Sequence, residues 1–362
     1  MKQSDFTWRQ RLVFSLHARY VRKESELHKL SYLFWECTSR CNIACKHCGS
    51  DCKMFSDSPD MLGNDFLDVL KNIAIHNNPA KVMVVVSGGE PLVRTDLEDV
   101  GIEITKLGFP WGMVSNGYAL NQERLHKLLD AGLCSVTISL DGLQESHDWL
   151  RGKNGSFEKA VNAIQMLSEI PNFLFDVVTC VNTRNFNELE DIKSMLIDLN
   201  VSKWRLFIVD PIGRAKDNPE LFITDHQFSQ LMDFIANNRQ YGEIMTAFGC
   251  DGFLGKYEAN VRQGIFFCRA GINAGSVLAN GDISACPNIN RGFVQGNIYK
   301  DDFMDIWNSK FQQFRNREGF KTGKCEECEV WKWCRSDGMH LHEPNNPNPI
   351  VCHYQKLSYK KL

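Results

Sequence analysis

Clustered cysteines are the residues of this sequence best suited to chemistry. There are 14 cysteines among 362 residues, and most lie in two groups, between residues 37 and 52 and between residues 268 and 352. Proteins held together by disulfides are typically shorter and secreted, whereas clustered cysteines in a long intracellular chain more often bind metals or do redox chemistry. Between the groups, Cys134 and Cys180 lie in apolar runs, where we expect buried free thiols.

Three cysteines of the first group, Cys41, Cys45 and Cys48, have the spacing C-x3-C-x2-C. Thiolates bind soft metals and hold iron–sulfur clusters. Three of them can hold a four-iron cluster with one iron left open to a substrate, as a catalytic metal site keeps a free position. The alternative is a structural zinc ion with Cys37 or Cys52 as fourth ligand; otherwise these two residues are free thiols or neighbours of the ligands.

The segment that must position this loop alternates between short apolar runs and amphipathic runs. Strands buried on both faces are predicted at residues 32–35, 82–86, 112–115, 135–140, 173–181 and 204–209. Helices are predicted at residues 62–73, 125–129, 156–167 and 189–199, the third with Ser156 as N-cap. Alternation of this kind indicates an α/β fold. Six strands are too few for a full barrel, so we predict a partial, six-unit (β/α)6 barrel with its functional residues at the carboxyl ends of the strands.

The chain is predicted to have three parts: residues 1–29, the barrel at 30–240 and a cysteine-rich domain at 241–362. The first part has the pattern of a basic amphipathic helix, with lysines and arginines between aromatic and leucine residues. We expect this helix to pack across the barrel. The alternative is that it lies on a membrane surface or on a partner protein.

Composition narrows the possible functions. Lys and Arg number 41 against 44 Asp and Glu, a net charge of −3, so we expect no general nucleic-acid binding. No run approaches 18 apolar residues, which argues against a transmembrane helix. The first residues lack the apolar stretch of a signal peptide, and we therefore expect a cytoplasmic protein.

A second motif gives the three-cysteine loop a family resemblance. The sequence Ser-Gly-Gly-Glu-Pro-Leu, which contains Gly88, Gly89 and Glu90, stands at the end of the second predicted strand. Together the two motifs resemble the radical SAM superfamily. The resemblance implies that the three cysteines hold a [4Fe–4S] cluster and that this segment holds the amino group of S-adenosylmethionine (SAM). Glycines let a backbone approach a ligand closely, and Glu90 offers an acceptor to an ammonium group.

Further polar residues follow the third and fourth predicted strands. Asn116 stands in Ser-Asn-Gly, Ser139 and Asp141 in Ser-Leu-Asp-Gly, and Arg151 ten residues later. In this order they resemble the SAM-contacting positions of the peptide-modifying branch of the superfamily. The resemblance implies that Ser139 and Arg151 contact the methionine carboxylate, for which the planar fork of arginine is suited. It places Asn116 and Asp141 near the ribose.

The second cysteine group resembles the SPASM extension, which carries auxiliary iron–sulfur clusters in radical SAM enzymes that modify peptides and proteins. The resemblance implies one auxiliary [4Fe–4S] cluster held by Cys325, Cys328, Cys334 and Cys352. The family pattern has a further cysteine where this chain has Gly338. An inner site would keep only Cys268 and Cys286, so a second auxiliary cluster is expected to be absent, to be smaller or to borrow Cys250, His340 or His342. Structural zinc is the alternative for this domain.

The resemblance implies reductive cleavage of SAM to a 5′-deoxyadenosyl radical, which abstracts hydrogen from a peptide or protein substrate. A flavodoxin or ferredoxin is the expected electron donor. Cys48-Gly-Ser-Asp-Cys52 and the basic first helix are also similar to SPASM enzymes paired with small lipoproteins. One alternative is maturation of a tetrapyrrole or metallocofactor. Another is a non-catalytic iron–sulfur or zinc scaffold, which would not need the SAM-facing residues. No general acid or base is assigned.

Overall fold

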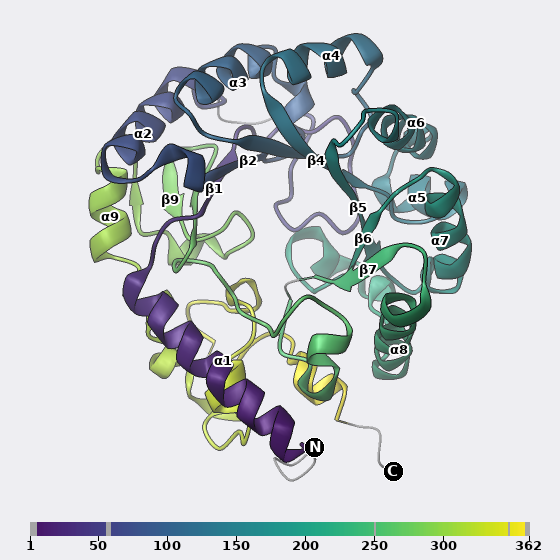
Figure 1. The fold of residues 1–362 in the computed structure, drawn as a ribbon, viewed down its shortest axis with the longest axis vertical. Helices are drawn as coiled ribbons and strands as arrows, with labels where there is room; N and C mark the ends of the chain where they lie inside the picture. Colours follow the sequence, from purple (N-terminus) through teal and green to yellow (C-terminus); the bar gives the residue numbers. More distant parts are fainter. Residues whose placement is uncertain (1–5, 56–58, 250, 347, 359–362) are drawn as a thin grey trace.

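The computed structural model describes residues 6–55, 59–249, 251–346 and 348–358, and one ten-stranded sheet organises them. The strand order is β10-β9-β8-β1-β2-β3-β4-β5-β6-β7. Neighbours from β8 to β7 run parallel, and β8-β9-β10 are antiparallel. The sheet curves around the interior without closing (Figure 1), which confirms the predicted partial barrel. The strands are β1 (Tyr32–Glu36), β2 (Met83–Ser87), β3 (Trp111–Ser115), β4 (Leu133–Ser139), β5 (Leu174–Val181), β6 (Lys203–Ile208), β7 (Met245–Phe248), β8 (Ala274–Val277), β9 (Asp282–Ser284) and β10 (Gly296–Asn297).

Helices cover the outer side of the curved sheet, and the C-terminal segments fill the open side (Figure 1). The six predicted strands are β1 to β6, and the predicted helices are α2, α4, α6 and α7. The strands β7 to β10 lie beyond residue 240 and continue the same sheet. The helices are α1 (Trp8–Leu27), α2 (Gly63–His76), α3 (Leu97–Lys106), α4 (Gln122–Asp130), α5 (Gln144–Arg151), α6 (Ser156–Ser168), α7 (Leu189–Asp198), α8 (Asp225–Tyr241), α9 (Phe303–Ser309), α10 (Gln312–Arg315), α11 (Trp331–Cys334) and α12 (His353–Lys356).

The two faces of the parallel strands differ in burial, so the expectation that both are fully buried is wrong. In β2, Val84 and Val86 are fully buried and belong to the core shared with α2. Met83, Val85 and Ser87, on the opposite face, are only half-buried. The outer face packs beneath helices, whereas the inner face borders the interior of an open barrel. The interior thus keeps room for a ligand.

The helix α6 begins differently from the prediction. Its N-cap is Gly155, with φ of +76°, and Ser156 is its first helical residue. The capping acceptor comes from α5: the Asp148 carboxylate accepts hydrogen bonds from the Gly155 N–H at 2.7 Å, the Ser156 hydroxyl at 2.8 Å and the Phe157 N–H at 2.8 Å. A carboxylate is favourable at a helix N-terminus. This contact fixes α5, which carries Arg151, against α6.

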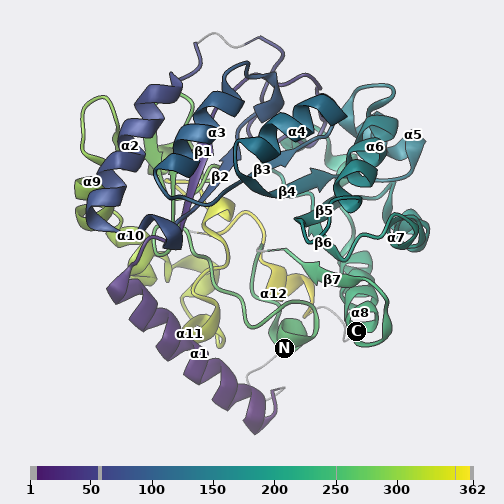
Figure 2. The ribbon, with the colours of Figure 1, turned by 45° about the horizontal axis from the view of Figure 1, so that its top comes forward.

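The helix predicted within residues 1–29 is present as α1, but it packs on the C-terminal part of the chain and not across the barrel. Phe14 of α1 lies 5.2 Å from Trp333 and 5.5 Å from Phe253, measured between ring centroids. Figure 2 shows α1 beside α10 and α11. Burial of the large Phe14 ring explains this docking. The opposite face of α1 leaves Leu12 and Leu16 half exposed.

Two smaller expectations have different outcomes. From the sequence we also expect Trp307, Trp331 and Trp333 in the core of the C-terminal domain; all three are buried, but Trp307 packs in the main core and Trp333 with Phe14. Cys180 is a half-buried free thiol, but Cys134, the second residue of β4, is exposed. In the part of the chain that the structure describes, no helix has the length and apolar character needed to cross a membrane.

Candidate active site

The three-cysteine loop follows β1 and lies at the carboxyl edge of the sheet. Cys41 and Cys45 are buried and Cys48 is half-buried. Contacts from distant segments hold the loop: the Lys46 N–H donates to the carbonyl of Leu150 at the end of α5, at 2.8 Å. Arg214, just after β6, donates from Nε to the Cys45 carbonyl at 2.8 Å and from its backbone N–H to the Cys48 carbonyl at 3.0 Å. The end of α5 and the segment after β6 therefore position the cysteines.

The spacing of the sulfurs bears on the zinc alternative. Cys52 lies beside Cys48, whereas Cys37 is fully buried apart from this group. Across the described ranges, no three cysteine sulfurs lie within 4.8 Å of one another. A tetrahedral zinc ion with Zn–S bonds of about 2.3 Å would hold its sulfur ligands about 3.8 Å apart. The three-thiol donor set is the one expected for an iron–sulfur cluster with one open iron, and the choice between this cluster and zinc stays a prediction.

Hydrogen-bond donors approach two of these sulfurs. Arg151 Nη1 lies 3.7 Å from Cys45 Sγ, and Asn116 Nδ2 lies 3.9 Å from Cys41 Sγ. Burial raises the pKa of Cys41 to about 11 and also raises that of Cys45. These buried thiols need a positive partner to ionise, which a metal centre supplies. Donors near the sulfurs also tune the potential of a cluster held there.

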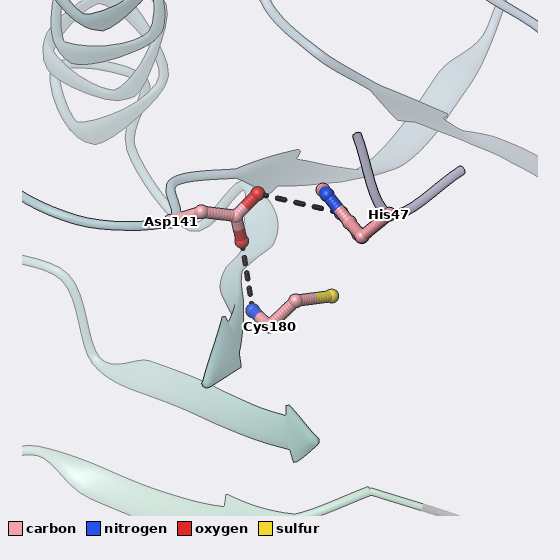
Figure 3. A group of neighbouring side chains, drawn as sticks. All are labelled: His47, Asp141 and Cys180. Carbon is pink, nitrogen blue, oxygen red and sulfur yellow. Dashed lines mark hydrogen bonds and ion pairs between the residues drawn. The ribbon is translucent and has the colours of Figure 1, made fainter. Parts of the chain in front are cut away.

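Arg151 and Asp141 form a buried ion pair beside the loop. Arg151 Nη2 lies 2.6 Å from Asp141 Oδ2, and Asp141 Oδ1 accepts the Cys180 N–H at 2.7 Å. Figure 3 shows Asp141 between His47, whose Nε2 is 3.7 Å from Oδ2, and Cys180. Burial opposes ionisation of Asp141, but the Arg151 guanidinium holds the pKa of that carboxyl below its ordinary value. Burial lowers the pKa of His47 to about 4, so this imidazole is neutral near pH 7.

One N–H donor of the Arg151 guanidinium is unpaired. Its Nε is buried and has no hydrogen-bond partner in the described part of the chain. A buried donor without a partner costs free energy, and an anionic ligand oxygen would remove that cost. Arg151 is therefore suited to hold a carboxylate in addition to Asp141.

Glu90 is buried where β2 and β3 end. Its carboxylate accepts the Leu92 N–H at 3.1 Å, the Ser115 hydroxyl at 2.8 Å and the Asn116 N–H at 2.8 Å. Burial raises the pKa of Glu90, and these hydrogen bonds oppose the shift. An ionised carboxylate has about four acceptor sites. One site therefore remains for an ammonium donor.

The two glycines before Glu90 are required by close backbone contacts. A Cβ on Gly88 would overlap the Thr38 carbonyl, and one on Gly89 would overlap the Arg40 carbonyl. The close approach is thus to the start of the cysteine loop, which the Gly89 and Glu90 N–H groups bond at 2.8 and 3.0 Å. Ser139 lies half-buried at the end of β4. The contacts of these residues with SAM stay predictions.

The four cysteines predicted for the auxiliary cluster share one environment. Cys325, Cys328, Cys334 and Cys352 line a common small cavity. The Asp337 N–H donates to Cys334 Sγ at 3.3 Å, and the same sulfur lies 3.3 Å from Asp337 Oδ1. Burial, and then the Asp337 carboxylate, raise the pKa of Cys334 well above its ordinary range. The donor set agrees with the four thiolates of a [4Fe–4S] cluster.

Among the described residues, Cys268 and Cys286 are the cysteines of the predicted inner site, and its occupancy stays a prediction. Cys268 is held by Arg317 and by backbone N–H groups, which lower the pKa of its thiol although burial opposes them. A Cβ built on Gly338 would lie 2.5 Å from Cε1 of His340, so the His340 ring fills the space of the missing cysteine. His342 is engaged, with Nε2 2.7 Å from the Ser336 carbonyl. Cys250 lies outside the described residues.

A cleft of about 280 Å³ opens between the barrel and the C-terminal part, next to the cysteine loop. Its walls include Ser50 of the loop, Ile212 after β6, Asn290 after β9 and His340. Two basic side chains on its walls are already ion-paired: Lys216 with Glu343 at 2.9 Å, and Arg291 with Glu36 at 2.8 Å. The cleft therefore borders the segment that directly follows Cys48.

Comparison with known proteins agrees with this geometry. The family model of the radical SAM superfamily matches residues 35–196, and that of SPASM, an iron–sulfur cluster-binding domain, matches residues 268–329. An AdoMet-dependent heme synthase from Oleidesulfovibrio alaskensis is 26% identical over 345 residues, with 89% of this chain and 86% of that protein covered. The mycofactocin maturase MftC from Mycolicibacterium smegmatis is 29% identical over 316 residues, covering 85% and 77%.

Solved structures share the fold at low sequence identity. Streptococcus suis SuiB bound to S-adenosylmethionine superposes with a TM-score of 0.70 at 15% identity, covering 93% of this chain and 80% of that one. The structure of anSMEcpe with bound AdoMet gives a TM-score of 0.71 at 15% identity, covering 91% and 95%. The match to the iron–sulfur domain ends before Cys334 and Cys352, so the roles of these two residues rest on the geometry above.

Proposed function

Because the chain belongs to the radical SAM superfamily and carries a SPASM domain, we propose that this enzyme cleaves SAM reductively and abstracts a hydrogen atom from a peptide or protein. The observation that carries the proposal is the open loop of three cysteines with Arg151 and Asn116 aimed at its sulfurs. When bound, the cluster and SAM supply one-electron cleavage and a 5′-deoxyadenosyl radical. Cys41, Cys45 and Cys48 would hold the cluster.

The residues of this chain bind and orient SAM. Glu90 has one free acceptor site for the ammonium group, and Arg151 Nε has a free donor for the carboxylate. Asp141 keeps Arg151 in place through their ion pair. Placing both ends of the amino acid between two buried, oppositely charged groups orients SAM and excludes water, which strengthens each contact.

A peptide or protein substrate is supported by two observations. A mycofactocin maturase is 29% identical across most of this chain, and the same fold holds a precursor peptide in SuiB.

Tetrapyrrole maturation is a second candidate, because the relatives include heme synthases at 26% identity over 89% of this chain. Both candidates need an external electron, for which we propose a flavodoxin or ferredoxin. We also propose a cytoplasmic site of action. None of the 13 described cysteines forms a disulfide, as is usual in reducing compartments. The exposed face of α1 could contact a membrane surface or a partner protein.

The test begins with anaerobic purification and reconstitution with iron and sulfide, followed by incubation with dithionite and SAM. We expect about eight irons per chain, corresponding to two four-iron clusters, and formation of 5′-deoxyadenosine. A Cys41/Cys45/Cys48→Ala variant should lose about four irons and all SAM cleavage. Zinc in place of iron, or a fully loaded enzyme that leaves SAM intact, would contradict the proposal.

The substrate class is tested separately by adding proteins encoded beside the gene, or iron coproporphyrin III, to the active enzyme. A mass change in an added protein that requires both SAM and the three cysteines supports the peptide assignment. Conversion of the porphyrin with the added proteins unchanged would favour the tetrapyrrole assignment instead.

A further inference from the structure

Two aspartates and two histidines meet inside the molecule, next to the predicted inner site: His340 lies near Cys268, and His353 directly follows Cys352. Asp210 follows β6 and Asp251 follows β7, so both stand at the carboxyl edge of the sheet. His340 lies in a short 3-10 turn, and His353 begins α12. The barrel thus supplies the acids and the C-terminal part supplies the imidazoles. We call these four residues the Asp/His cluster.

The distances within the Asp/His cluster are too long for direct hydrogen bonds. His340 Nε2 lies 3.7 Å from Asp210 Oδ2 and 3.9 Å from Asp251 Oδ1. His353 Nε2 lies 4.0 Å from Asp210 Oδ1. Ligand atoms of Asp210, Asp251 and His340 all lie within 4.8 Å of one another. With bonds of about 2.1 Å, the ligands of one ion lie about 3.4 Å apart in a tetrahedral site and up to about 4.2 Å in an octahedral one.

Several polar atoms of the Asp/His cluster have no partner in the described chain. His353 is completely buried, and neither of its ring nitrogens makes a hydrogen bond. Asp251 is 5% exposed and its Oδ2 is without a partner, as is Oδ1 of Asp210. Buried polar atoms are almost always satisfied, so unpaired atoms on three side chains that face one another indicate a missing ligand.

The charge of the Asp/His cluster indicates that the missing ligand is a cation. Among the described residues, no lysine or arginine forms an ion pair with either aspartate. The nearest buried guanidinium, that of Arg262, donates to the Gly252 carbonyl at 3.0 Å and acts on Asp251 only through its charge. Two buried carboxylates with no lysine or arginine in direct contact are costly. A bound cation would compensate both.

We propose that the Asp/His cluster binds one divalent cation of the first transition row, such as Mn²⁺, Fe²⁺ or Zn²⁺, separate from the iron–sulfur clusters. Imidazole and carboxylate ligands without thiolate are typical of such ions. The exposed edge of His340 lines the cleft between the barrel and the C-terminal part, which gives the ion an entry path. The same opening leaves one side of the ion accessible to an oxygen ligand from a substrate.

Gly338 explains why this site exists in this chain. Without a side chain at 338, the His340 ring packs over that glycine, and the Gly338 N–H donates to the Asp251 carbonyl at 3.2 Å. A cysteine at 338 would displace the ring. The substitution that removes a ligand from the predicted inner site therefore creates the space for His340 in the Asp/His cluster.

The test is a room-temperature EPR titration of the reconstituted holoenzyme with Mn²⁺ in the absence of SAM. Free Mn²⁺ gives a six-line spectrum that broadens on binding, and the iron–sulfur clusters contribute no signal at that temperature. We expect one Mn²⁺ to bind per chain and to be released by Zn²⁺. An Asp210→Asn/Asp251→Asn variant keeps the shapes of both side chains and should bind at least about 100-fold more weakly, because even outer-sphere changes cost about 10- to 100-fold.

Two further variants complete the experiment. Glu343→Gln removes a carboxylate on the cleft wall that is paired with Lys216 and should bind Mn²⁺ as the parent does. His340→Gln removes one ligand and serves if the double variant does not fold. Iron and sulfide contents measured in each protein show that the clusters are intact. An unchanged free Mn²⁺ signal with the parent, or equal binding by the parent and the folded variants, would overturn the proposal.

Discussion

The two cysteine sites lie in opposite electrostatic surroundings. At the barrel loop, Arg151 and Asn116 direct N–H groups at the sulfurs. A hydrogen bond from Cys52 lowers the pKa of Cys48 to about 6. At the C-terminal site, the nearest charged group to Cys334 is the Asp337 carboxylate, 3.3 Å from its sulfur. Both sites have N–H donors on a sulfur, but the charged group in contact with a sulfur is a cation, Arg151, at the barrel loop and an anion, Asp337, at the C-terminal site.

This difference in charge affects how easily each predicted cluster is reduced. Hydrogen bonds and positive charge near a cluster favour its reduced state, and negative charge disfavours it. The three-cysteine loop is also open to a further ligand, whereas the C-terminal set supplies all four thiols to one cavity. An added electron is therefore better stabilised at the barrel loop, where SAM is expected to bind.

The largest effect is expected when the cation of the barrel site is removed. Arg151→Gln leaves Asp141 buried without its partner, which should lower the free energy of unfolding by about 3–5 kcal/mol. SAM cleavage should also be lost. Anaerobic urea unfolding and 5′-deoxyadenosine formation measure the two effects.

The double variant Arg151→Gln/Asp141→Asn separates these effects. It removes both buried charges, so most of the lost stability should return while SAM cleavage stays absent. If the double variant regains SAM cleavage, Arg151 serves only as the partner of Asp141 and does not bind SAM.

The C-terminal site depends instead on packing with α1. Phe14→Ala removes a buried ring that contacts Trp333 and Phe253 and should cost about 3–4 kcal/mol. Leu12→Ala, on the exposed face of the same helix, should change stability by less than about 0.5 kcal/mol. Hydrogen exchange of residues 8–27 reports the undocking directly. Equal protection in the two variants would show that α1 is held by other contacts.

The pH dependence of stability should come mainly from the barrel side. Burial, followed by the Arg151 charge, lowers the pKa of His147 to about 4 in the folded protein, against about 6.5 when unfolded. The unfolded state then binds more protons between these values. The stability is fully present above pH 6.5 and decreases as the pH falls toward 4, by about 2 kcal/mol between pH 7 and pH 5.

His147→Gln tests this assignment. Nδ1 of His147 accepts the Asp141 N–H at 3.0 Å, and the glutamine oxygen offers a similar acceptor that does not titrate. Urea unfolding at pH 7 and pH 5 should show a smaller difference for the variant than for the parent. The same slope in both proteins would assign the pH dependence to other groups.

The smallest expected effect is on the potential of the C-terminal site. Asp337→Asn removes a negative charge beside Cys334 and keeps the oxygen that accepts the Phe253 N–H at 2.7 Å. The reduction potential of the auxiliary cluster should become more positive, while that of the barrel cluster changes less. A redox titration followed by EPR resolves the two. A shift confined to the barrel cluster would contradict the comparison.

The barrel strands could be predicted because each of the six is an apolar run next to a periodic helix. The four later strands have only two to four residues each, which is too short for a periodic signal. Their pairing depends on tertiary contacts, as when β8 joins β1. The wrong placement of α1 has the same origin: periodicity identifies an apolar face but not the surface that it packs against.

The candidate site was predictable where its residues stand in local motifs. Cys41, Cys45, Glu90, Asn116 and Arg151 come together because parallel strands end at one edge. Arg214, which holds the cysteine loop, went unassigned, although its position just after a predicted strand was an available signal.

The Asp/His cluster could not be derived in the same way. Its members come from two strand ends and two C-terminal turns, and no motif joins them. The sequence predicts His340 only as a ligand that the inner cluster could borrow, and no spacing pattern marks Asp251. Because Gly338 has no side chain, the His340 ring can pack over it and reach the aspartates.

The parallel pairing of β1 with β8 has a consequence for biosynthesis. Residues 32–35 bond to residues 274–277, so one edge of the first strand stays unpaired until more than two thirds of the chain has been translated. At about 5–20 residues per second this interval lasts roughly 12–50 s. Throughout it, the cysteine loop that follows β1 is accessible from the unfinished side of the barrel, so iron and sulfide can be delivered before the last strands close over it.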